Sequence, residues 1–297
     1  MSDTTASLRR KIDIAGNLQS VVRTMKALAA SSIGQYEQSV RALGDYYHTV
    51  ELGLGVCFRD VGLSALIAGE TKQTNKGVIG AVVFGSDQGL VGQFNDVVAD
   101  YAVKTLAALT DKANVWAVGE RVHARLADAG LPLLGLFPVP NSVKAITPLV
   151  GRILVESETH RNRGDVTDLY LFYNRPTSGA VYTSVRQRLL PLDETWRREL
   201  AELPWPMENL PEIMGGKTET LRALIREYLF VSLFRACAES LASENASRLA
   251  AMQRADKNID ELLEDLNSTF HRLRQSGIDA ELFEVISGFE ALRKAEN

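Results

Sequence analysis

The sequence has little of what metal binding and redox chemistry usually require. It contains two cysteines, Cys57 and Cys237, with no CxxC pair, and four histidines that lie in no metal-ligand spacing such as HxxxH or HExxH. These absences exclude the common zinc and thiol-exchange motifs, and we predict neither a cofactor nor a catalytic residue. We interpret the cysteines as free thiols in a reducing compartment, with a disulfide as the alternative.

Long apolar runs and an excess of positive charge are also missing. The net charge is −4, which gives no signature of nucleic-acid binding. No stretch approaches the roughly 18 consecutive apolar residues of a membrane span, and the first residues, MSDTTASLRR, lack the apolar core of a secretory signal. We therefore expect no direct membrane span and no nucleic-acid partner. If the protein works at a membrane, it does so through other proteins.

Glycine and proline are absent from Lys217 to Ser276. At 1.5 Å per residue this stretch predicts a helix about 90 Å long. Apolar residues recur at the a and d positions of a heptad that starts at Leu224. The predicted seam of this helix includes Met252, Ile259, Leu262 and Leu266. So long a helix cannot be the interior of a compact domain of this size, so another helix must cover its seam.

The other long helical pattern runs from Ser7 to about Leu54 and contains no proline. It repeats the heptad, with Ile12, Val22 and Ala29 in its seam. Its glycines each cost about 1 kcal/mol relative to alanine, so this helix also needs a partner. We predict that residues 1–56 and 209–297 pair as an antiparallel coiled coil. An ordinary helical bundle beside a second domain is the alternative.

Between the two ends, residues 76–192 alternate short β-rich runs with helical patterns. The last two strands, joined by the residues TSG, indicate an antiparallel hairpin, and a proline-rich link follows. Strand–helix–strand order is typical of a partly parallel sheet covered by helices. The predicted fold class is therefore α+β/α/β, with a Rossmann-like α/β domain inserted between the N- and C-terminal helices.

The most enzyme-like stretch is FGSDQGLVGQFN, from Phe84 to Asn95. It lies between a predicted strand and a predicted helix, where phosphate-binding turns occur. Its spacing fits neither GxGxxG nor GxxxxGK[ST], and Asp87 would repel a phosphate. We interpret it as a structural turn, in which Gly89 and Gly92 permit the bend and Asp87 or Ser86 binds backbone amides there. Nucleotide binding remains the alternative.

Charge differs between the two helices. The C-terminal helix carries many charged residues that we interpret as a solvated face, including Glu239, Glu244, Arg248, Arg254 and Asp256. The N-terminal helix is basic between Leu8 and Gly34, where Arg9, Arg10, Lys11, Arg23 and Lys26 face a single acid, Asp13. A basic helix end fits an acidic protein neighbour, and a solvated face fits equally well.

Three stretches together resemble a known family. The segment from Leu241 to Gly288 contains ASE, AAM and RQ groups in the order found in the C-terminal helix of the gamma subunit of F-type ATP synthases. SLRRKIDIAGNLQSVVRTMKALAASSI resembles its N-terminal helix, and GSDQGLVGQFN resembles its SDRGLCGxxN turn. Three departures are Gln88 for the arginine and Val91 for the cysteine of the turn, and Asp256 for a threonine.

The resemblance implies the central-stalk rotor subunit of a bacterial F-type ATP synthase, which is not catalytic by itself. It would couple ion flow through the membrane sector to ATP synthesis or hydrolysis in the catalytic ring. Its implied partners are the alpha and beta subunits of F1, the epsilon subunit and the membrane c-ring, at the cytoplasmic face of the bacterial inner membrane. The residues implied to face the ring are Arg23, Met25, Lys26, Arg254, Gln275 and Glu281. The alternative is an α/β-domain enzyme with a helical oligomerisation hairpin, which would bind a small ligand by itself.

Overall fold

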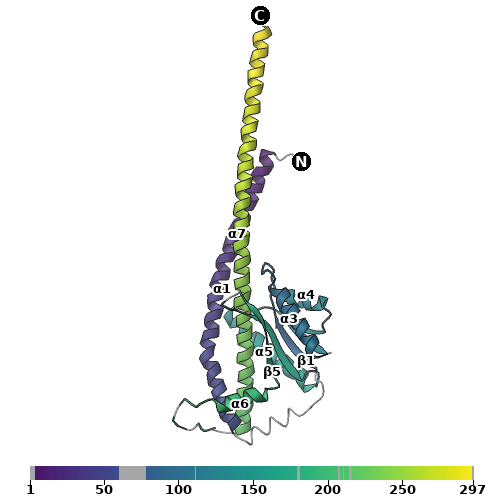
Figure 1. Ribbon diagram of the computed structural model, residues 1–297, viewed down its shortest axis with the longest axis vertical. Coiled ribbons are helices and arrows are strands. Elements are labelled where there is room, and N and C mark those ends of the chain that lie inside the picture. The colour runs from purple at the N-terminus through teal and green to yellow at the C-terminus, as the bar shows by residue number, and fades with distance from the viewer. Residues whose placement is uncertain are drawn as a thin grey trace. The chain divides into compact units, whose positions relative to one another are not determined.

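The computed structural model describes residues 4–59, 78–110, 112–178, 181–206, 208–209, 211–213 and 216–295. The chain divides into two units, one formed by residues 1–28 with 249–297 and the other by residues 29–248. Figure 1 shows the chain and labels its elements where there is room. The elements are α1 (Thr5–Arg59), β1 (Ile79–Phe84), α3 (Phe94–Leu109), β2 (Ala113–Val118), α4 (Glu120–Asp128), β3 (Leu133–Phe137), α5 (Val143–Asn162), β4 (Asp168–Arg175), β5 (Thr183–Leu190), α6 (Glu194–Glu202) and α7 (Lys217–Ala295).

The larger unit contains a five-stranded mixed sheet in the order β3-β2-β1-β4-β5. Strands β3, β2, β1 and β4 run parallel, and β5 pairs antiparallel with β4. Every residue of β1, IGAVVF, is buried. A continuous apolar run of this kind is expected of a strand that is covered on both faces.

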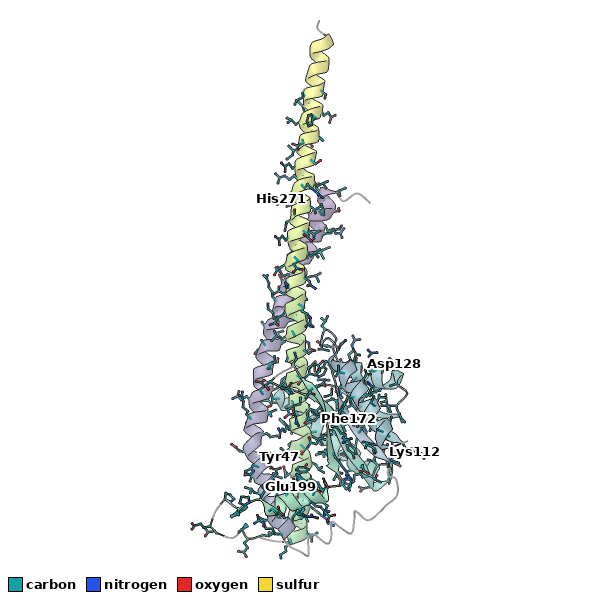
Figure 2. All side chains as sticks on the ribbon, in the orientation of Figure 1. Tyr47, Lys112, Asp128, Phe172, Glu199 and His271 are labelled. Atoms are coloured by element: carbon teal, nitrogen blue, oxygen red, sulfur yellow. The ribbon has the colours of Figure 1, made fainter. Side chains whose placement is uncertain are left out.

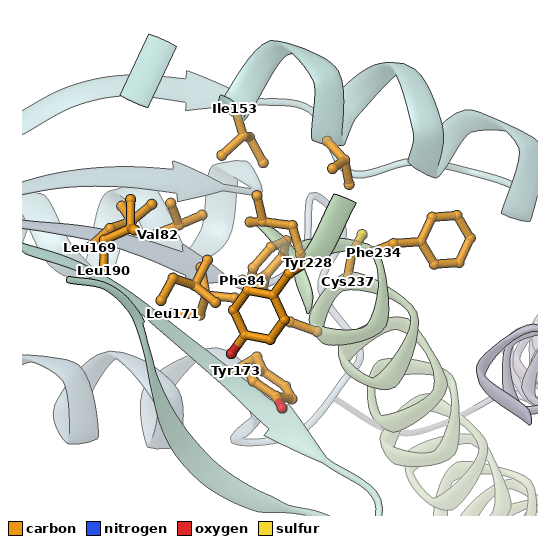
Figure 3. Packing of buried hydrophobic residues seen from close by; sticks show 14 of the residues in the cluster. Val82, Phe84, Ile153, Leu169, Leu171, Tyr173, Leu190, Tyr228, Phe234 and Cys237 are labelled. Carbon is orange, nitrogen blue, oxygen red and sulfur yellow. The ribbon is translucent and has the colours of Figure 1, made fainter. Parts of the chain in front are cut away.

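Helices α3 and α4 cover one face of the sheet, because their buried Val98, Leu106 and Leu126 join Ala81 and Val115 in one hydrophobic cluster. The other face belongs to a second cluster, which includes residues of α5 and α7. Figure 3 shows Val82, Phe84 and Tyr173 from the sheet, Ile153 from α5, and Phe234 and Cys237 from α7. The middle of α7 is therefore part of the core of the larger unit.

Helices α1 and α7 contact each other in opposite directions. In the larger unit, Tyr46 of α1 donates a hydrogen bond of 2.8 Å to Glu227 of α7. In the smaller unit, Arg23 of α1 lies 3.2 Å from Asp256 of α7. Each unit also has a second contact, between Gln19 and Asp260 in the smaller unit and between Gly53 and Leu224 in the larger one. In both units the lower number on α1 meets the higher number on α7, so the two helices are antiparallel within each unit.

Two elements were not predicted from the sequence. Strand β3, with the sequence LLGLF, forms an edge of the sheet, and α6 lies within the link that we interpreted only as proline-rich. Helix α6 begins where the Asp193 side chain accepts a hydrogen bond from the Thr195 amide, as N-caps do. Among the residues that the structure describes, no helix is both long enough and apolar enough to cross a membrane.

Candidate functional site

An ionic cluster joins the two helices in the smaller unit. Asp256 Oδ2 accepts a hydrogen bond from Lys26 Nζ at 2.7 Å, and its Oδ1 accepts one from Arg23 Nε at 3.2 Å. Arg23 also lies 3.7 Å from Asp260, which Gln19 contacts as well. The hydrogen bonds from Lys26 and then Arg23 hold the pKa of the Asp256 carboxyl below its ordinary value. Asp256 therefore stays charged and binds both cations of α1.

This cluster changes how two of the predicted ring-facing residues are understood. Lys26 and Arg23 have a partner within their own chain, although 36% and 57% of their side chains remain exposed. Asp256 is not a solvated charge as we expected, because only 13% of its side chain is exposed. The remaining residues implied to face the ring include Met25, which is half-buried, and three that are exposed, Arg254, Gln275 and Glu281.

The predicted seam residues differ in burial. Ala29 and Met252 are buried, with 2% and 3% exposure, and the half-buried members are Ile12, Val22, Ile259 and Leu266. The placement of Leu262 in the seam is wrong, because it is 49% exposed and its neighbour Leu263 is half-buried instead. A straight helix has 3.6 residues per turn, so its buried row drifts away from a strict seven-residue repeat.

Residues 271–287 of α7 have exposed side chains throughout. His271, labelled in Figure 2, begins a run of exposed side chains that continues to Ser287. This run includes the apolar residues Ile278, Leu282, Phe283, Val285 and Ile286, each 47% to 69% exposed. A contiguous exposed apolar surface of this kind usually marks a contact with another protein.

The turn after β1 is held by Asp87. Its Oδ1 accepts a hydrogen bond of 3.0 Å from the amide of Glu120, the first residue of α4, and its Oδ2 accepts one of 2.9 Å from the amide of Val139. The sequence predicted that Asp87 binds amides of its own turn, but these amides belong to two other segments. An amide at the start of a helix is the kind of group that binds phosphate. Here the chain's own carboxylate occupies it.

The glycines of this turn have different roles. Gly92 has a φ of +58°, a conformation that glycine adopts at little cost. Gly85 is required for space, because a Cβ there would lie 2.4 Å from the Cβ of Val122. The predicted need for Gly89 is wrong, since an added Cβ would meet only the Arg121 side chain at 3.8 Å. The other positive φ in the turn, +63°, belongs to Leu90.

Several polar residues of α7 are buried in the larger unit, and their burial was missed from the sequence. Glu239 and Glu244 are 6% and 5% exposed, although we expected both in a solvated face. Arg248 Nη2 donates to Glu244 at 2.6 Å, and the Ser247 hydroxyl donates to the carbonyl of Val91 at 2.6 Å. The small residues of the stretch CAESLASENAS were the available signal, because small side chains permit close packing on several sides of a helix.

Burial is the main cause that raises the pKa of the Glu244 carboxyl, and the positive charge of Arg248 opposes this effect. Burial also raises the pKa of the Cys237 thiol. Cys57 and Cys237 are both buried. A buried thiol with a raised pKa is a poor nucleophile, so Cys237 does not fit a catalytic role.

The comparisons with known proteins agree with this architecture. A family model described as ATP synthase matches residues 4–292, so the chain belongs to the ATP synthase family. Within that family its curated relatives are gamma chains. The ATP synthase gamma chain of Syntrophobacter fumaroxidans is 27% identical over 98% of this chain and 99% of its own length, and that of Clostridium pasteurianum is 28% identical over 96% and 97%.

Solved structures show the same fold. A chain in the OSCP/F1/c-ring structure of Euglena gracilis mitochondrial ATP synthase matches with a TM-score of 0.64 at 18% identity, covering 99% of this chain and 96% of that chain. A central-stalk chain of the Tetrahymena thermophila mitochondrial enzyme matches with a TM-score of 0.56 at 21% identity, covering 79% and 99%. Long N- and C-terminal helices and a central mixed sheet are thus shared with these ATP synthase structures.

Proposed function

We propose that this chain is the central-stalk rotor subunit of a bacterial F-type ATP synthase. It couples ion flow through the membrane sector to ATP synthesis or hydrolysis in the catalytic ring, and it is not catalytic by itself. The observation that carries this proposal is the antiparallel contact of α1 and α7 within each unit, with an α/β domain between them in the sequence. The gamma-chain relatives match almost the full length of the chain.

In this proposal α1 and α7 form an antiparallel coiled coil that serves as the shaft, and the sheet domain is a Rossmann-like foot. Buried Ala15 and Ala29 support close approach of the two helices, which makes the shaft thin. A shaft that turns inside a ring of alpha and beta subunits must not bind strongly at one angle. Exposed ion pairs of about 0–1 kcal/mol satisfy this requirement, because they can break and form again at each step.

The proposed contacts with the ring combine charged and apolar side chains. The exposed edge of Arg23 and the side chains of Met25 and Arg254 lie in the smaller unit, as do Gln275 and Glu281. The exposed apolar run from Ile278 to Ile286 supports an additional contact with an apolar lining. The foot would contact the epsilon subunit and the c-ring, with the complex at the cytoplasmic face of the inner membrane.

The alternative function is an enzyme with a helical oligomerisation hairpin. The turn after β1, which suggested nucleotide binding, does not support it. The carboxylate of Asp87 already occupies the amides of Glu120 and Val139, which a phosphate would need. Among the described residues, no group of three or more histidines, cysteines, aspartates or glutamates is arranged to hold a metal ion.

Affinity purification of the tagged chain from its native host tests the proposal. Alpha, beta and epsilon subunits should copurify with it, and the complex should hydrolyse ATP while the chain alone does not. As a control, Arg161, an exposed residue of α5, can carry a substitution to glutamine without loss of copurification. Purification of the chain without any ATP synthase subunit, or ATP hydrolysis by the chain alone, would contradict the proposal.

A further inference from the structure

A buried carboxylate lies between α7 and the sheet of the larger unit. Only 7% of the Glu239 side chain is exposed. Its Oε2 accepts a hydrogen bond of 2.8 Å from Arg175 Nε, and its Oε1 accepts one of 2.8 Å from Arg235 Nε. Arg175 is the last residue of β4, whereas Arg235 lies one turn before Glu239 on α7. One carboxylate therefore holds a guanidinium group from each element.

Arg175, which makes this contact from the sheet, is itself held in place by a neighbouring residue. Arg175 Nη2 donates to the Tyr173 hydroxyl at 2.6 Å, and the guanidinium lies 5.6 Å from the centre of the Tyr173 ring. Burial, and secondly the charge of Glu239, raise the pKa of Tyr173, so its hydroxyl stays neutral. Tyr173 is fully buried. Arg175 is thus oriented before it reaches Glu239, which reduces the entropy lost in forming the contact.

Most of the remaining contact between the sheet and α7 is apolar. Leu171 and Tyr173 of β4 belong to the same hydrophobic cluster as Phe234 and Leu241 of α7. Hydrophobic packing has no preferred direction, so it resists separation more than it resists sliding or twisting. Charge-assisted hydrogen bonds are directional and stronger than neutral ones. The hydrogen bonds of Glu239 therefore resist sliding and twisting of α7 against the sheet, which apolar packing resists only weakly.

We propose that Glu239 and Arg175 are the positioning residues that transmit torque between the α/β domain and α7. This inference rests on the proposed rotor function, in which the foot domain and the shaft must turn together. The pair holds α7 in register against β4 while force acts along the sheet. Arg235 keeps the Glu239 carboxylate oriented towards Arg175.

The test uses the complete ATP synthase, reconstituted in vesicles, with Glu239→Gln in this chain. Glutamine keeps the shape of the side chain and removes its charge. ATP hydrolysis and ATP-driven uptake of protons and of sodium ions are measured together. We expect the variant to transport fewer ions for each ATP hydrolysed. Its ion uptake should also stop at a smaller ion gradient across the vesicle membrane than in the wild type. Reduced folding would lower both rates equally and leave their ratio unchanged.

Arg175→Gln should lower the same ratio, and the double variant should lower it no further than either single change, because both act through one contact. Glu158→Gln, which alters an exposed glutamate of α5, is the matched control and should leave the ratio unchanged. If Glu239→Gln does not assemble, Arg175→Lys keeps the charge but loses the planar geometry, and it should show the same loss in a weaker form.

The inference is overturned if Glu239→Gln, or Arg175→Lys in its place, transports as many ions per ATP as the wild type up to the same gradient. That result would leave the rotor function intact. Failure of the wild-type chain to assemble with ATP synthase subunits would instead overturn the proposed function. The two failures are therefore distinguishable.

Discussion

Lys26 Nζ lies 2.7 Å from Asp256 Oδ2, so a basic residue of the N-terminal helix is bound by an acid of the C-terminal helix. Arg23 binds the other oxygen of the same carboxylate. The run VVRTMKALAASS has two basic residues among small apolar ones, and this contact explains both of them. Their first partner is the chain itself, and only their exposed edges are available to a neighbour.

Replacing Asp256 by asparagine should lower the melting temperature of the chain at neutral pH, because two cations lose their partner. The lowered pKa sets the sign of the pH dependence. The stabilising contribution of Asp256 is present above its ordinary value of 3.8 and is lost as pH falls through the lower folded value. The difference between wild type and Asp256→Asn should therefore shrink in acid and also at high salt. A difference that grows under either condition would contradict the ion-pair account.

Met252 and Leu262 give opposite expectations for the seam. Met252 is 3% exposed, so Met252→Ala should lower the free energy of unfolding by about 2–4 kcal/mol. Leu262 is 49% exposed, and Leu262→Ala should cost less than about 1 kcal/mol. Urea unfolding of the purified variants measures both. If both variants lower the free energy of unfolding by the same amount, the assignment of Met252 to the buried face of α7 and Leu262 to the exposed face is wrong.

The Asp87 turn can be tested without reference to partners. Asp87→Ala removes the acceptor of two backbone amides and should cost about 1.5–3 kcal/mol for each lost bond to the charged group. Asp87→Asn retains one oxygen acceptor and should cost less. Thermal unfolding ranks the variants. If Asp87→Ala is as stable as the wild type, the carboxylate does not hold the turn.

Glu244 should make stability fall as pH rises. Its pKa is raised in the folded chain above the ordinary value of 4.5, so the folded state binds its proton more tightly than the unfolded state. Its contribution is fully present below the unfolded value and is lost as pH rises through the folded value. In Glu244→Gln this dependence is absent, so the stability of the wild type relative to the variant should decrease from acid to neutral pH. A flat or increasing difference in the unfolding free energy would be the contrary result.

The long helices could be predicted because their signal is local. An absence of glycine and proline, combined with apolar residues at heptad spacing, indicates a helix that needs a helical partner. A helix was also predicted after the glycine-containing turn that ends at Asn95, and α3 lies there. A strict seven-residue repeat only approximates a helix with 3.6 residues per turn, so it did not distinguish Leu262 from its half-buried neighbour Leu263.

The enclosed charges of α7 could not be predicted in the same way. Glu239 is buried because Arg175 reaches it from β4, 64 residues earlier in the chain, and no local pattern encodes that approach. Strand β3 was missed because LLGLF is short and lies at the sheet edge, where only β2 pairs with it. Both features depend on tertiary contacts and not on periodicity.

The most direct test of the central claim is to observe rotation of this chain inside its complex. Cys57 and Cys237 are buried, so Lys112→Cys, at an exposed position between α3 and β2, gives a reactive thiol for a visible probe. The complex is immobilised through its catalytic ring and supplied with ATP. The account predicts that the probe turns in one direction, in steps that depend on ATP. A probe that stays fixed while the same complexes hydrolyse ATP would contradict the account.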